Sequence, residues 1–364
     1  MTLATSQKQT YIANIDFLRA VAVLSVVAHH TFAVTGFQVP YFYRLGGYIG
    51  VQLFFIISGY LICESAAKHS TAEYATHRFF RIFPAYWIAM CAVDFCLGGF
   101  ASARAVDHPI WFALSVLNLQ QLYAAALLEL DVLHVTWTLT VEMMWYCIAP
   151  LALIAYRRFA WPTLTMLAVM SVVWSLAATG HYLDSLYAAG FSAMDVPILP
   201  GQYEIVVGAA FPAQIVFFGM GAVVYRYREQ AMHIGTVPLL ACMFLCLSLF
   251  DYYGPYVVHP PLPIGIGLTA FFVLMLRAPT VHLPFFTHLG KISYSIYLLH
   301  FPIILWCFQK WGYLGKLHLI GTSVLIILLS HLLYVFVERP SMAFARRLRA
   351  LKAISAARLR RTIS

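Results

Sequence analysis

Long apolar stretches recur along almost the whole of this chain, and each is long enough to cross a lipid bilayer as a helix. About 20 apolar residues in a helix span the hydrocarbon core of a membrane. Applied to this sequence, that length predicts about ten membrane helices, at 15–35, 46–66, 82–100, 134–156, 161–180, 205–226, 234–252, 261–277, 291–310 and 317–338. The sequence therefore predicts an all-α, polytopic membrane protein.

Composition excludes the ordinary soluble classes. Of the 364 residues, 62% are apolar and 10% are charged, whereas a soluble domain has about 45–50% and about 25%. The net charge of +9 comes from short basic clusters between the apolar stretches, which favours membrane topology over a nucleic-acid partner. The seven cysteines lie inside apolar stretches without zinc-binding spacing. We therefore expect a lipid bilayer as the surroundings, no nucleic acid and no bound metal.

Lysine and arginine are concentrated in alternate loops, and in multi-pass proteins such loops face the cytoplasm. The predicted cytoplasmic loops carry Lys68, Arg78, Arg81, Arg157, Arg158, Arg226 and Arg228. The last residues, 339–364, are basic and contain no Asp or Glu. We therefore expect both termini in the cytoplasm, with a short segment at 1–14, a membrane domain at 15–338 and a basic tail at 339–364. No cleavage site follows the first helix, so we expect a retained signal anchor.

Arg19 and His30 are ionisable residues in the first predicted helix, where a charge is costly unless it is paired or hydrated. They are 11 residues apart in the sequence, and steps of about 100° return them to within about 20° on one helix face. Their axial separation is roughly 16 Å, with His30 past the middle of the bilayer. His29 points about 100° away. The alternative for His30 is a buried histidine with its hydrogen bonds satisfied.

Other polar residues in the predicted spans suggest further parts of a site. Arg78 and Arg81 lie three residues apart on one helix face, and two guanidinium groups suit a phosphate; the alternative is an anchor that follows the positive-inside rule. Glu142 can orient a catalytic partner, receive a substrate hydroxyl or pair with a buried arginine. Tyr297 and His300 share a face near the middle of the bilayer. Glu338, at the end of the last span, is interpreted as a structural anchor.

Five segments of the sequence together resemble the membrane-bound acyltransferase 3 family. In chain order they contain Ile15, Asp16, Leu18, Arg19 and His30; Gly47, Gly50, Val51, Phe54, Phe55, Ser58 and Gly59; Arg78, Arg81, Pro84 and Tyr86; Trp137, Leu139, Glu142, Tyr146 and Pro150; Gly290, Ser293, Tyr294, Tyr297 and His300. Each segment alone is a weak signal, but all five occur in order. The resemblance extends from the first to the last predicted helix.

The resemblance implies transfer of an acyl group, most often acetyl, from cytoplasmic acyl-CoA to a sugar hydroxyl. The implied acceptor is an exopolysaccharide, an O-antigen or a related envelope glycan, including a lipid-linked repeat unit, and polysaccharide-assembly proteins are candidate partners. It also implies location in a bacterial inner membrane, with acetyl-CoA as donor and no bound cofactor. Some relatives carry a fused hydrolase-like domain, and this chain ends before one, so we expect the membrane domain to complete the transfer.

The expected roles follow from the chemistry. A hydroxyl is a weak nucleophile until a base removes its proton, so His30 is the candidate base or acyl carrier and Glu142 the residue that orients a catalytic partner. Arg19, Arg78 and Arg81 are candidate ligands of the acyl-CoA phosphates. Ser58, Tyr297 and His300 are candidates for the acceptor side or for supporting contacts. The alternative functions are a secondary transporter or proton-coupled permease and a passive scaffold.

Overall fold

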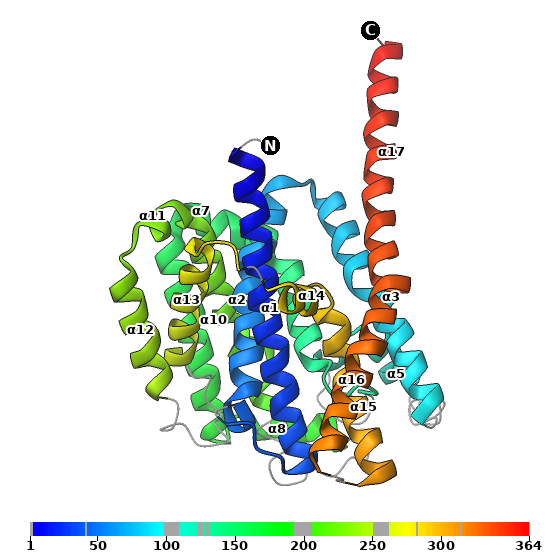
Figure 1. Cartoon of the computed structure of the whole chain (residues 1–364). Coiled ribbons are helices and arrows are strands. Elements are labelled where there is room, and N and C mark those ends of the chain that lie inside the picture. Colours follow the sequence, from blue (N-terminus) through cyan, green and yellow to red (C-terminus); the bar gives the residue numbers. More distant parts are fainter. Residues whose placement is uncertain are drawn as a thin grey trace.

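The computed structural model describes residues 3–40, 42–97, 109–122, 127, 131–192, 206–249, 262–281, 283–312 and 315–363, and the regular structure there is entirely helical. The longer helices run in a bundle around α1 and α2 (Figure 1). The elements are α1 (Leu3–Thr35), α2 (Phe42–Lys68), α3 (Thr71–Leu97), α5 (Pro109–Val116), η1 (Gln120–Leu122), α7 (Trp137–Thr179), α8 (Asp184–Ser192), α10 (Phe211–Arg226), α11 (Arg228–His233), α12 (Thr236–Ser248), α13 (Leu262–Arg277), α14 (Pro284–Lys291), α15 (Ser293–Trp311), α16 (Lys316–Leu333), the π-helical η3 (Tyr334–Glu338) and α17 (Arg339–Ile363).

Every predicted membrane range overlaps a helix, but the helices begin and end at other residues than the predicted ranges. Within the described residues, six helices are long and apolar enough to cross a membrane. The pair α14 and α15 meets that test only when joined across a 78° bend, and α12 and α13 are shorter apolar helices. The predicted all-helical class is confirmed for this part of the chain, whereas the number of ten crossings stays a prediction.

The long helix α7 covers two predicted spans and contains a kink at Phe159. The helical hydrogen-bond pattern continues through Phe159, whose backbone angles (φ −138°, ψ 54°) are not helical. After this kink, Trp161 stacks on Tyr227 at the end of α10, and Ser171 donates a hydrogen bond to the carbonyl of Pro212 at its start (3.0 Å). The second half of α7 therefore runs antiparallel to α10, and the kink separates the ranges predicted at 134–156 and 161–180.

The centre of the bundle depends on close backbone approach between α2 and α10. A methyl group at Gly59 would lie 2.1 Å from the carbonyl oxygen of Phe218, and one at Gly221 would lie 2.0 Å from that of Ile56. Small residues at such crossings let membrane helices pack through backbone contact. The first half of α7 adds Trp145, which is fully buried and stacks on Phe218. These contacts hold α2, which carries Ser58, against the helix that carries Glu142.

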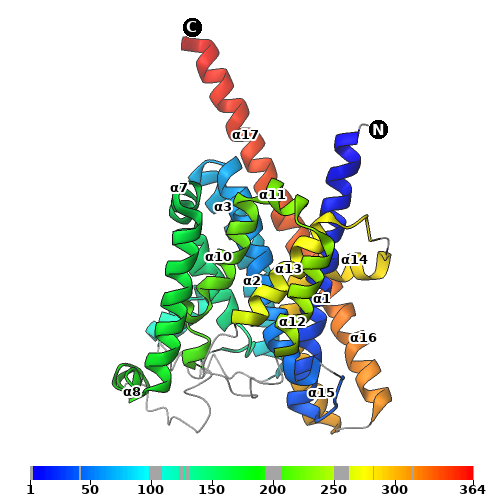
Figure 2. The same cartoon turned by 90° about the vertical axis from the view of Figure 1, so that its left-hand side faces the viewer.

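Both termini lie at the same end of the bundle, where α17 extends beyond the other helices (Figures 1 and 2). That arrangement fits an even number of crossings. The tail predicted at 339–364 begins at the first residue of α17, which follows η3 without a loop. The domain boundaries and the cytoplasmic side of this end remain predictions.

Candidate active site

A cavity of about 100 Å³ lies between α1, α2, α3, α7 and α15. It collects most of the polar residues singled out in the sequence. Its lining includes Arg19, Ser58, Arg78, Arg81, Glu142 and Tyr297. His30 and His300 do not line it, but they lie directly beyond Tyr297. The structure thus gives the candidate site two ends, one of arginines and one of histidines.

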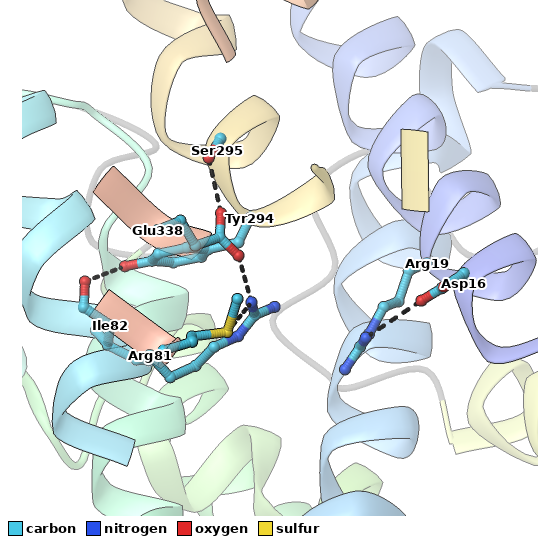
Figure 3. A network of polar contacts seen from close by, with 8 residues as sticks. Asp16, Arg19, Arg81, Ile82, Tyr294, Ser295 and Glu338 are labelled. Atoms are coloured by element: carbon cyan, nitrogen blue, oxygen red, sulfur yellow. Dashed lines mark hydrogen bonds and ion pairs between the residues drawn. The ribbon is translucent and has the colours of Figure 1, made fainter. Parts of the chain in front are cut away.

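Arg81 is held by a buried carboxylate. It forms an ion pair with Glu338 of η3, whose side chain is fully buried. Ser295 donates a hydrogen bond to the other carboxylate oxygen of Glu338 (2.8 Å), and the guanidinium lies over the ring of Tyr294, 5.7 Å from its centre (Figure 3). These contacts tie α3, α15 and η3 together. Glu338 therefore has the geometry of the structural anchor expected from the sequence.

Arg19 is also paired, although less tightly. Its guanidinium lies 3.6 Å from the carboxylate of Asp16, one turn earlier on α1, and Figure 3 shows this pair on the opposite side of the site from Arg81. The 27% exposure of Arg19 and its place in the cavity lining leave part of the guanidinium open to a ligand. Asp16 belonged to the recognised sequence segment but had no assigned role.

Arg78 differs from both. It forms no ion pair within the described residues, and its Nε atom is buried without a hydrogen-bond partner. The guanidinium lies between the rings of Tyr74 and Tyr146, 5.6 and 5.4 Å from their centres. Aromatic faces stabilise a cation without neutralising it. Arg78 therefore lines the cavity without an ion-pair partner among the described residues.

Glu142 accepts hydrogen bonds from two hydroxyl groups in the cavity lining. Its Oε1 accepts hydrogen bonds from Ser58 and from Tyr146 (2.7 Å for the latter). Because Tyr146 also lies against Arg78, the carboxylate and the unpaired guanidinium share a neighbour. The sequence did not identify Tyr146 as functional, although its position four residues after Glu142 on a helix was a usable signal. No contact joins Glu142 to His30 in the described part of the chain.

The two histidines meet beyond the cavity. Nδ1 of His30 lies 2.7 Å from Nε2 of His300, and the ring of Phe301 packs edge-on against His30 (4.9 Å between centres). His29 instead places its Nδ1 3.0 Å from the carbonyl oxygen of Tyr43 on α2. The structure therefore separates the adjacent histidines as the helix geometry predicted, with His30 facing the site.

Tyr297 stands between the cavity and this histidine pair. Its ring lines the cavity and lies 5.6 Å from that of His300, one turn further along α15. Its hydroxyl donates to the carbonyl of Val135 (2.8 Å) and accepts from Thr138 (2.6 Å). Thr138 also lines the cavity and was not identified from the sequence. Tyr297 thus joins α15 to the start of α7 at the point where the two ends of the site meet.

A buried carboxylate shapes the loop that leads into α7. Asp131 accepts hydrogen bonds from the backbone amides of Leu133 (3.2 Å) and Thr136 (2.8 Å). Burial raises the pKa of Asp131 above its ordinary value, because a low-dielectric environment disfavours the charged form. This loop sets the direction in which α7 begins, and therefore the place of Thr138 and Glu142.

Comparison with known proteins places this architecture in a family. A family model described as an acyltransferase domain matches residues 12–336. The chain belongs to this acyltransferase family. The matched range contains the cavity and both histidines, and it ends just before Glu338. No solved structure matches the chain at a significant level.

Curated members of the acyltransferase family are similar along most of this chain. Peptidoglycan O-acetyltransferase OatA of Listeria monocytogenes is 25% identical over 84% of this chain and 51% of its own length. Nodulation protein 10 of Rhizobium leguminosarum is 24% identical over 90% of this chain and 93% of its own. The O-acetyl transferase of Shigella phage Sf6 is 23% identical over 89% and 94%. The chain thus spans about half the length of the Listeria relative but nearly all of the other two.

Proposed function

We propose that this protein is a membrane O-acetyltransferase that moves an acetyl group from cytoplasmic acetyl-CoA to a sugar hydroxyl of an envelope glycan. The observation that carries the proposal is that Arg78 and Tyr297 line one cavity, and that Tyr297 packs against His300, which is in turn within hydrogen-bond distance of His30. The names of two relatives, an O-acetyltransferase of peptidoglycan and a phage O-acetyl transferase, support the same reaction. The family match does not favour the transporter alternative.

The arginine end is the proposed donor site. The phosphates of coenzyme A are polyanionic, and a guanidinium offers them bidentate, charge-assisted hydrogen bonds. Arg78 has no carboxylate competing for it among the described residues, whereas Arg19 and Arg81 do. The helix rise between Arg19 and His30, roughly 16 Å, is on the order of an extended pantetheine arm. Since Arg19 and Arg78 line the same cavity, a donor whose phosphates bind there would direct its thioester towards His30.

His30 is the proposed base or acyl carrier. In the first route the sugar hydroxyl gives its proton to His30, its oxygen attacks the thioester carbonyl, and the carbon–sulfur bond breaks. The departing thiolate then takes the proton from the imidazolium. In the second route a ring nitrogen of His30 attacks the thioester carbonyl and displaces the CoA thiolate; the sugar hydroxyl then attacks the acetyl group, the carbon–nitrogen bond breaks, and the hydroxyl proton passes to the thiolate. Both routes require an unprotonated ring nitrogen that faces the substrate.

The proposed acceptor is an exopolysaccharide, an O-antigen or another envelope glycan, including a lipid-linked repeat unit. The bacterial plasma membrane is the proposed location, with the arginine end on the cytoplasmic side. In this arrangement the donor enters from inside and the acceptor is met beyond the histidine pair. Glu142 is proposed to order Ser58 and Tyr146 around the donor, since these are its hydrogen-bond partners.

A reconstituted assay tests the proposal. Purified protein in lipid nanodiscs is incubated with radiolabelled acetyl-CoA and candidate glycans, with no ion gradient, and release of free CoA is followed with transfer of label. We expect release and transfer together. A protein that binds no acetyl-CoA and transfers nothing, while its deletion leaves glycan acetylation unchanged by mass spectrometry, contradicts the proposal.

The sidedness of the donor site has its own test. Ser70 lies exposed between α2 and α3, at the end of the bundle that carries the arginines. In a variant without the native cysteines, Ser70→Cys should react with an impermeant thiol reagent only after the cells are opened, because the flanking loop is rich in Lys and Arg. Labelling in intact cells would place the arginine end outside and remove the basis for a cytoplasmic donor.

A further inference from the structure

The protonation of His300 can be read from its hydrogen bonds. Its Nδ1 lies 2.8 Å from the carbonyl oxygen of Tyr297 and 3.2 Å from that of Ile296, both on the same helix. A carbonyl oxygen can only accept, so this nitrogen carries the hydrogen and donates. The side chain is fully buried, and no carboxylate contacts it within the described residues. A buried charge without such a partner is costly, so the ring is neutral and its Nε2 bears a lone pair.

That assignment fixes the neighbouring ring. Nε2 of His300 lies 2.7 Å from Nδ1 of His30, and two nitrogens at this distance share one hydrogen. Since Nε2 of His300 has only a lone pair, the hydrogen is on Nδ1 of His30. In a neutral imidazole the other nitrogen is then unprotonated. His30 is therefore left with its lone pair on Nε2.

The ring geometry supports a directed hydrogen bond. The ring centres are 5.0 Å apart and the planes differ by 22°. With nitrogens only 2.7 Å apart, a centre-to-centre distance this long means that the rings meet edge to edge. The N–H of one ring and the lone pair of the other both lie in the ring planes, so they point at each other. Phe301 packs edge-on against His30 and limits rotation of the ring.

We propose that His300 is a positioning residue that holds His30 in the tautomer protonated on Nδ1, so that Nε2 is the atom that removes the acceptor proton or carries the acetyl group. This rests on the proposed function of His30. His300 does not touch the substrate in this role. It acts as the orienting partner does in other nucleophile and base pairs, with a neutral ring and a backbone carbonyl in place of a carboxylate.

A matched pair of amide variants tests the proposal. In His300→Gln the amide oxygen can reach the place of Nε2 and accept from His30. In His300→Asn the side chain is one methylene shorter and reaches only as far as Nδ1. We expect His300→Gln to keep kcat within about tenfold of the parent, and His300→Asn to lose on the order of a hundredfold. The KM for acetyl-CoA should change little in either variant, because the donor phosphates bind elsewhere.

The outcomes separate the inference from the proposed function. Equal losses of kcat in two variants that keep the parental melting temperature would mean that His300 does not set the tautomer. If the parent protein itself transfers no acetyl group, the proposed function fails instead. A second measurement needs no active variant: in nitrogen-15 spectra of histidine-labelled parent protein, the signals lost in His30→Gln should show a protonated Nδ1 and a bare Nε2. The reverse assignment would overturn the inference.

Discussion

The two ends of the site satisfy their polar groups in opposite ways. At the arginine end, Arg19 and Arg81 each meet a carboxylate, while Arg78 lies between aromatic rings. At the histidine end, His30 bonds to His300, His300 also bonds to backbone carbonyls, and no carboxylate hydrogen-bonds to either ring in the described residues. The contrast fits the proposed roles, in which the arginine end binds an anion through Arg78. The histidine end in these roles keeps an uncharged base.

The largest expected effect is at the histidine end. His30→Ala should lower kcat about 10²–10⁴-fold, the usual contribution of a general base, while acetyl-CoA still binds with parental affinity. His29→Ala is the matched control, because His29 bonds to the backbone of α2 instead, and its activity should stay within a few fold. Kinetics with titration calorimetry measure both. A reversed order of the two variants would contradict the assignment of the base.

The next effect is on stability and concerns the buried ion pair. Arg81→Ala leaves the Glu338 carboxylate buried without its partner, and removing one member of such a pair costs about 3–5 kcal/mol. Replacing both residues, as in Arg81→Met with Glu338→Leu, should restore most of the melting temperature, since apolar groups of similar size can substitute for a buried pair. Thermal melting in detergent measures this. If the double variant is no more stable than Arg81→Ala, an unpaired buried carboxylate is not the cause of the lost stability.

The contrast between the two arginines is tested through donor binding. Arg78→Ala should weaken CoA binding by about 1.5–3 kcal/mol, the range for hydrogen bonds to charged groups, with a smaller change in kcat. Arg78→Lys should lie between, because it keeps the charge but loses the planar fork. The Arg81→Met, Glu338→Leu double variant is the control and should keep parental affinity. A strong loss of CoA binding in that control would show that Arg81 also binds the donor, and would contradict the different roles of Arg78 and Arg81.

The smallest expected effect concerns Glu142. Tyr146→Phe removes one hydrogen bond to the carboxylate but keeps an aromatic ring beside Arg78, so a loss of about 0.5–1.5 kcal/mol in kcat/KM is expected. Ser58→Ala should produce a loss of similar size. Steady-state kinetics at several donor concentrations measure both. If either variant were as inactive as His30→Ala, the hydroxyl concerned would take part in the chemistry directly.

Local spacing allowed part of this site to be predicted. The helix pitch alone predicts Arg19 and His30 on one face with His29 turned away; in the structure Arg19 lines the cavity, His30 meets His300, and His29 meets the backbone of α2. The spacing of Arg78 and Arg81 put both in one cavity. The spacing could not show that Arg81 is paired and Arg78 is not, because the carboxylate that pairs with Arg81 lies 257 positions later in the chain.

The fold, like the site, was predicted only in part from the sequence. Apolar length predicted ranges that each overlap a helix, since a bilayer requires backbone hydrogen bonds to close within each segment, but α5, α8, α11 and α17 lie outside those ranges. The 78° bend between α14 and α15 and the non-helical backbone at Phe159 were not predicted, because hydropathy averages over a window and does not report direction. The apolar span that contains α10 runs over Val206–Arg226, close to the predicted 205–226, and Pro212 lies in the first turn of α10, where proline needs no amide hydrogen.

The sequence by itself determined that this chain is a helical membrane protein with a basic end and a histidine on the face of Arg19. Only the tertiary structure decided which polar groups are already satisfied. It paired His300 with His30 across 270 residues and Glu338 with Arg81, and among the residues that the structure describes it left Arg78 without an ion pair. Periodicity constrains residues that share one helix, whereas the partner of a buried charge depends on how separate helices pack. That packing, not the motif, distinguishes Arg78, the proposed ligand of an anion, from Arg81, which is paired with a buried carboxylate.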